Sequence, residues 1–247
     1  NAGATGAFNL LAQGGVSGQG GNVNVTLTDA NTALNVGSLV GQFNIDARGG
    51  AVGGRITLSS GQNLNVTAAN AQFGNFGALG NFDGGRVSLS ASGNVFWNGN
   101  LNAAGQGVGD GGQVTIRHGG FGSFYINAGN FGSGINGTLS VATGLLAGNG
   151  GLIDISTTGS AGILINGGFT FNANGLVTPG AVGTPQAVGG IAGGTGATSG
   201  TMNGGTVNIN TNGITVLTSG TTTMTASGAG SGNGGTINFN HRLLGIQ

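Results

Sequence analysis

The stretch GGRVSLSASGNVFWNGNLNAAGQGVGDGG, residues 84–112, contains the pattern that decides the fold of this 247-residue chain. A diglycine is followed by an alternation in which Val87 and Leu89 are apolar and Ser88 between them is polar. Residues two apart on a β-strand share a face, so the apolar residues are predicted to point inward. A second diglycine ends the stretch, and the alternating segment QVTIR follows it.

The same unit occurs seven times along the chain. Its second glycines lie at positions 21, 54, 85, 112, 151, 205 and 235, so the steps are 33, 31, 27, 39, 54 and 30 residues. A repeat of this length with strand-like alternation is typical of stacked repeat architectures. We therefore expect one continuous all-β domain over residues 1–247.

Each unit contains two more short strand-like segments. In the quoted stretch, Val95 and Trp97 belong to the second segment, and Leu101 and Ala103 belong to the third. In three units the third segment begins 11 residues before the second glycine of the next pair, which indicates a coil of fixed perimeter. The pattern predicts a right-handed parallel β-helix, a β-solenoid of about eight coils with three short strands in each. Glycine and asparagine at the corners are expected to supply positive φ angles.

The units at 84–112 and 204–235 resemble the repeats of filamentous haemagglutinin-type proteins, and the resemblance extends from about residue 8 to residue 240. It implies a right-handed β-helix exported by a Gram-negative bacterium, usually by two-partner secretion. It also implies an extracellular or cell-surface location and a role as a fibrous adhesin.

Composition argues against several classes of function. The chain has five Arg, five Asp, no Lys, no Glu and no Cys, and its net charge is zero. No basic field is present to hold nucleic acid, and no apolar run is long enough to insert into a membrane as a helix. So few acids and bases predict a protein that is not an enzyme and needs no cofactor.

Charged residues beside the diglycines are the candidates for ligand binding. Asp83 and Asp110 occupy the same position in consecutive units, so together with turn carbonyls they are weak candidates for a calcium site. The alternative is that each Asp makes a turn hydrogen bond or pairs with Arg86. Arg55 and Arg86 both follow a diglycine, and they could act as a sugar or carboxylate clamp or remain as solvated surface arginines.

The outward positions of the last two diglycine strands form another candidate surface. Thr206, Asn208 and Asn210 are expected to lie beside Thr236, Asn238 and Asn240 and to form amide ladders. Such a face could bind glycans or ice, so an ice-binding solenoid remains an alternative. A polysaccharide-acting enzyme is also an alternative, although His118 and His241 have no acidic or cysteine companions nearby in the sequence.

Two stretches break the repeat. The Gly/Pro/Ala-rich segment at about 176–203 contains both prolines and is about 23 residues longer than the regular spacing allows. We expect this insertion to leave the rod. A smaller expansion lies near 127–138.

The two ends of the chain carry little charge to oppose association. A β-helix exposes unpaired backbone groups at its terminal coils, which favours the addition of further strands. The sequence therefore predicts an extracellular structural protein that self-associates end to end into a surface fibre or matrix filament. The alternative is an adhesin segment whose outer face binds glycans or host matrix. The residues expected to take part in assembly are Asn1, Phe8, Leu10, Leu243, Leu244 and Ile246.

Overall fold

A computed structural model describes most of the chain and shows parallel β-sheets without a helix in the described residues. No helix in that part is long and apolar enough to span a membrane. The described residues are 8–38, 43–68, 75–77, 83–105, 109–126, 132–136, 138–141, 148–158, 162–166, 170–173, 190–193, 201–213, 215–219, 223–225, 229–230 and 232–241.

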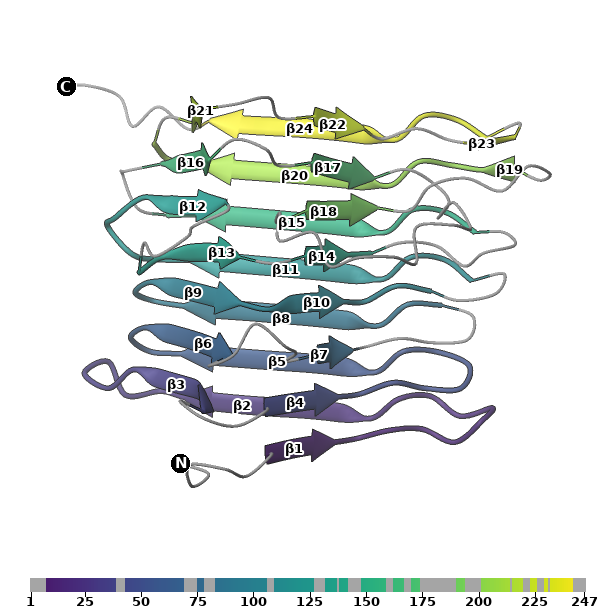
Figure 1. Ribbon diagram of the computed structural model, residues 1–247, viewed down its shortest axis with the longest axis horizontal. Coiled ribbons are helices and arrows are strands. Elements are labelled where there is room, and N and C mark those ends of the chain that lie inside the picture. Colours follow the sequence, from purple (N-terminus) through teal and green to yellow (C-terminus); the bar gives the residue numbers. More distant parts are fainter. Residues whose placement is uncertain are drawn as a thin grey trace.

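The strands that follow the diglycines form one open parallel sheet, which we call sheet 1 (Figure 1). Each of its strands has six residues, and the strands follow one another in chain order without a shift in register. In spatial order they are β2 (Asn22–Leu27), β5 (Arg55–Ser60), β8 (Arg86–Ala91), β11 (Gln113–His118), β15 (Leu152–Thr157), β20 (Thr206–Thr211) and β24 (Thr236–His241).

Two further parallel sheets contain the other predicted segments. Sheet 2 consists, in spatial order, of β3 (Leu34–Ser38), β6 (Leu64–Ala68), β9 (Val95–Asn98), β13 (Gly134–Asn136), β12 (Phe124–Ile126), β16 (Ile163–Asn166) and β21 (Thr215–Ser219). Sheet 3 consists of β1 (Phe8–Leu11), β4 (Phe43–Asp46), β7 (Asn75–Gly77), β10 (Asn100–Asn102), β14 (Thr138–Ser140), β18 (Gly190–Gly193), β17 (Thr170–Ala173) and β22 (Thr223–Thr225). A small antiparallel pair joins β19 (Thr201–Met202) to β23 (Ala229–Gly230).

Both irregular stretches contribute an additional strand to a sheet. In sheet 2, β13 lies between β9 and β12, although it follows β12 in the chain. In sheet 3, β18 lies between β14 and β17 and pairs with both. The expectation that the 176–203 insertion leaves the rod is therefore wrong for residues 190–193. Most of the remaining insertion lies outside the described residues.

The alternation predicted for sheet 1 is confirmed in its inner strands. The apolar residues are buried and the residues between them are partly exposed, because successive side chains of a strand point to opposite faces of the sheet. Each fully buried aliphatic side chain contributes roughly 1.5–3 kcal/mol. The side chains with no more than 1% exposure in this sheet include Ile56, Leu58, Val87, Leu89, Val114, Ile116, Ile153, Ile155, Val207 and Ile209.

The last strand of sheet 1 departs from this pattern. Ile237 is half-buried and Phe239 is 48% exposed, although both occupy positions that are buried in the preceding strands. Among the described residues β24 pairs only with β20, so nothing covers its other edge.

The diglycines form a column in which one glycine packs directly against the next. A Cβ atom on Gly112 would collide with the carbonyl oxygens of Gly85 and Ala103, and the second glycines of the later pairs are equally close to the unit before. The described glycines with positive φ are elsewhere, at Gly37, Gly99, Gly134, Gly148 and Gly162. The diglycines are therefore required for close backbone contact between strands, and the positive φ angles expected of corner glycines occur at those five other positions.

Candidate functional site

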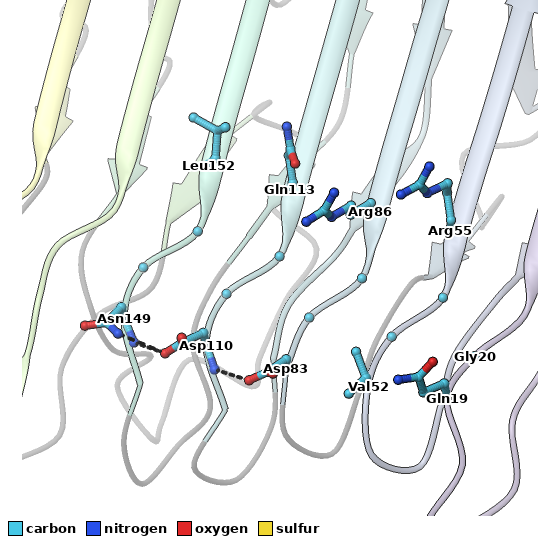
Figure 2. Close-up of a pocket in the computed structure, with 18 of the residues that line it drawn as sticks. Gln19, Gly20, Val52, Arg55, Asp83, Arg86, Asp110, Gln113, Asn149 and Leu152 are labelled. Atoms are coloured by element: carbon cyan, nitrogen blue, oxygen red, sulfur yellow. Dashed lines mark hydrogen bonds between the residues drawn. The ribbon is translucent and has the colours of Figure 1, made fainter.

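A polar groove of about 710 Å³ runs over the diglycine column, across successive strands of sheet 1. Figure 2 shows Arg55, Arg86 and Gln113 along one side, at the starts of β5, β8 and β11. The other side is formed by the residues that precede the diglycines, including Asp83 and Asp110. The backbone of the diglycines lies between the two walls and lines the groove.

Side chains before the diglycines form a continuous hydrogen-bonded ladder. Asp83 Oδ1 accepts the backbone N–H of Asp110 at 3.1 Å, and Asp110 Oδ1 accepts the backbone N–H of Asn149 at 2.7 Å. Asn149 Oδ1 accepts from Asn203 Nδ2 at 2.9 Å, and Asn203 Oδ1 accepts the backbone N–H of Asn233 at 2.9 Å. Each side chain thus fixes the turn of the next unit and holds one wall of the groove in place.

This ladder accounts for the two calcium candidates. Asp83 and Asp110 are brought together as predicted, and one oxygen of each is occupied by an N–H group of the next unit. No group of three or more His, Cys, Asp or Glu side chains that could hold a metal ion occurs in the described part of the chain. The contacts that the structure shows are those of the alternative considered above, an Asp that makes a turn hydrogen bond.

The opposite wall carries two arginines without a carboxylate partner among the described residues. Arg55 and Arg86 are exposed and stand opposite each other on neighbouring strands, as predicted from their spacing. By contrast, Arg48 pairs with Asp46 and Arg117 pairs with Asp154, each at 2.6 Å. Arg55 and Arg86 are therefore available to a ligand.

The predicted amide ladder on the outer face of sheet 1 is confirmed. Asn238 Nδ2 donates to Asn208 Oδ1, and Asn240 Nδ2 donates to Asn210 Oδ1, each at 2.7 Å. Asn210 Nδ2 then donates to Asp154 Oδ1 at 2.9 Å. These amides satisfy one another along the face, so they stabilise the stacking of strands.

Sequence reasoning missed the role of Asp46, which lies at the end of β4 and is only 9% exposed. Its carboxylate accepts from Gln13 Nε2 at 2.6 Å and from Arg48 Nε at 2.7 Å. Burial opposes the charged form, but the hydrogen bonds from Arg48 and Gln13 outweigh it, so the pKa of Asp46 lies below its ordinary value. The cluster joins the segment after β1 to the end of β4.

His118 was also unexpected as a core residue, and it is 1% exposed. Its Nδ1 accepts the backbone N–H of Val95 at 3.0 Å, and its Nε2 lies 3.3 Å from the carbonyl oxygen of Gly122. This geometry requires a neutral ring protonated on Nε2. Burial lowers the pKa of His118, and the hydrogen bond to Gly122 opposes that shift only in part. The inward position of the sixth residue of β11 is a signal that could have identified it.

The buried histidine predicts a pH-dependent stability. The unfolded chain binds the proton first as pH falls, because the folded pKa lies below the ordinary value of 6.5. The contribution of the neutral His118 ring to the free energy of unfolding is therefore fully present above pH 6.5 and is lost as the pH falls below that value. Urea unfolding at pH 7.5 and 5.5 should show this loss of stability. The variant His118→Thr should reduce the loss. Threonine is chosen because Thr157 and Thr211 are the buried residues at the equivalent position of β15 and β20. An unchanged pH dependence in the variant would contradict the assignment.

The predicted assembly residues are only partly described. Leu10 lies in β1 and packs partly against the core, and Phe8 begins the same strand. Asn1, Leu243, Leu244 and Ile246 lie outside the described residues.

No family model, no curated protein and no solved structure matches the chain.

Proposed function

We propose that the chain is a right-handed parallel β-helix that serves as an extracellular structural protein, whose copies associate end to end into a surface fibre or matrix filament. In the described residues the strand edges at the two ends of the stack have no further pairing partner, and these edges are the main support. The resemblance to filamentous haemagglutinin-type repeats supports the extracellular or cell-surface location and export from a Gram-negative cell.

The three sheets support the β-helical part of this proposal. Consecutive strands of the chain enter sheets 1, 2 and 3 in turn, and the next strand returns to sheet 1 beside its predecessor. A chain that circulates in this way and advances by one strand spacing, about 4.8 Å, builds a coil. The two strands that lie out of chain order, β13 and β18, add one strand each to sheets 2 and 3, and the chain still passes through the three sheets in the same order.

The ends of the stack decide which strands meet first in a filament. Figure 1 shows β1 alone at the N-terminal end and β21, β22 and β24 together at the C-terminal end. A second copy placed with β2 on β24 would bring its β1 into the position of β22. That position is already occupied by β22, so β2 of the second copy cannot pair directly with β24. We therefore place β1 of the second copy on β22, where it extends sheet 3.

Leu11 in β1 allows a direct test of assembly. Ala12 donates its N–H to the carbonyl of Asp46 at 2.8 Å, so the N–H of Leu11 points away from β4, because neighbouring residues of a strand point in opposite directions. Leu11→Pro removes this donor without breaking a bond to β4 and should abolish filaments in negative-stain images. Leu11→Thr keeps the donor and should leave them intact. A wild-type protein that stays monomeric by light scattering at high concentration would refute end-to-end association.

Adhesion is a second candidate function, favoured by the polar groove. Its walls carry charged and amide side chains, and its volume of about 710 Å³ is within the range typical of small-molecule sites. In this function the rod presents a ligand-binding surface to a glycan or host matrix.

A further inference from the structure

We propose that the groove over the diglycine column binds an acidic polysaccharide that runs across the strands of sheet 1. This inference rests on adhesion, the second of the two functions proposed above, and it identifies the class of ligand and the residues that hold it.

The arginine wall is suited to anionic groups that repeat at the spacing of the strands. Arg55 and Arg86 are directly opposite each other in register, so their backbones are about 4.8 Å apart. Like charges directly opposite each other on neighbouring strands repel, and an anion between or above the two arginines removes that repulsion. Gln113 continues the wall on the next strand as a neutral hydrogen-bonding group.

The aspartate wall is suited to hydroxyl groups. Asp83 and Asp110 each use Oδ1 for the ladder, and Oδ2 of each has no partner in the described part of the chain. An ionised carboxylate only accepts hydrogen bonds, so these oxygens can bind a donor such as a sugar hydroxyl. They would repel a carboxylate placed against them.

Together the two walls call for a ligand with acidic groups along one edge and hydroxyl groups along the other. A polymer of uronic acids has this chemistry, because every residue carries one carboxylate and several hydroxyls. One carboxylate of such a chain can bind between Arg55 and Arg86, while hydroxyl groups of the chain face the aspartate wall. The polymer would lie over the glycines that line the groove between the two walls.

Binding of polygalacturonate oligomers to the full chain, measured by titration calorimetry, tests the inference. The double variant Arg55→Gln, Arg86→Gln should weaken binding about tenfold to a hundredfold, since each lost contact is a charged hydrogen bond. Arg117→Gln removes a charge of the same sign outside the groove and should change affinity less than about twofold. Methyl-esterified polygalacturonate should bind as weakly as the acid form binds to the double variant.

Asp110→Asn separates specific binding from diffuse attraction. Asparagine occupies this position in the next unit, as Asn149, so the ladder is preserved. Loss of a charged acceptor should weaken polygalacturonate binding about threefold, and the same change should strengthen binding of poly-glutamate, which has no hydroxyls.

Tighter polygalacturonate binding in Asp110→Asn, or equal losses in the double variant and Arg117→Gln, would overturn the inference. Wild-type binding that is unaffected by any groove variant would leave adhesion standing and place it on another surface. Absence of wild-type binding to both acidic and neutral glycans would refute adhesion itself.

Discussion

Replacing Leu89 with aspartate should unfold the rows around β8. Leu89 is fully buried, and its neighbours in register are Leu58 and Ile116, which are also fully buried. An ionised carboxylate at this position has no partner, and the leucine packing is lost as well, so the free energy of unfolding should fall by about 4 kcal/mol or more. That is a large part of the 5–15 kcal/mol typical of folded proteins. Denaturant unfolding followed by circular dichroism measures the loss.

Ser88→Asp is the matched control for this change. Ser88 lies on the other face of the same strand, between Thr57 and Thr115, which carry no charge. A carboxylate there remains hydrated, so stability should change by no more than about 1 kcal/mol. Thr115 is less suitable as a control because Asp154 is its neighbour on β15. Equal losses in Leu89→Asp and Ser88→Asp would show that the faces of the strand are assigned wrongly.

Gly112→Ala should cost about 3 kcal/mol, although only one methyl group is added. The new Cβ would meet the carbonyl oxygens of Gly85 and Ala103, and both belong to hydrogen-bonded backbone. Neither can move without disturbing the bond from Gln113 N–H to Gly85 or from Gly112 N–H to Ala103, each 2.9 Å long. Thermal unfolding of the variant measures the effect.

Gly122→Ala provides the comparison, because a Cβ at Gly122 meets no atom within 4 Å. Its effect on the free energy of unfolding should stay within about 1 kcal/mol. Similar destabilisation by both substitutions would mean that glycine is needed for backbone freedom at both positions, and close packing would no longer explain the diglycine repeat.

The positions of the strands and their inward faces could be predicted because they depend on local patterns. Val87 and Leu89 alternate with polar residues over a single strand, and this period is readable without knowledge of the fold. The pairing of Arg55 with Arg86, and the contact between Asp83 and Asp110, followed from equal positions in consecutive repeats. Both predictions required only that the repeats stack in register.

Exceptions arose where a residue type and its position disagreed. His118 is polar and was not predicted to be buried, yet it occupies the inward sixth position of β11, where the N–H of Val95 and the carbonyl of Gly122 are its partners. Phe239 is apolar and inward by pattern, but it is 48% exposed because β24 is the edge of its sheet in the described residues. Local periodicity contains no information about which neighbours cover a strand.

The sequence by itself determined the all-β class, the seven diglycine strands and the inward side of each, because these depend on residues two apart on one strand. Only the tertiary structure decided that β13 and β18 enter sheets out of chain order, and that the diglycines are required by contact between strands. It also decided that Arg55 and Arg86 face Asp83 and Asp110 across one groove. The physical reason is that these arrangements join residues of different repeats, and their energies depend on the packing of the whole stack.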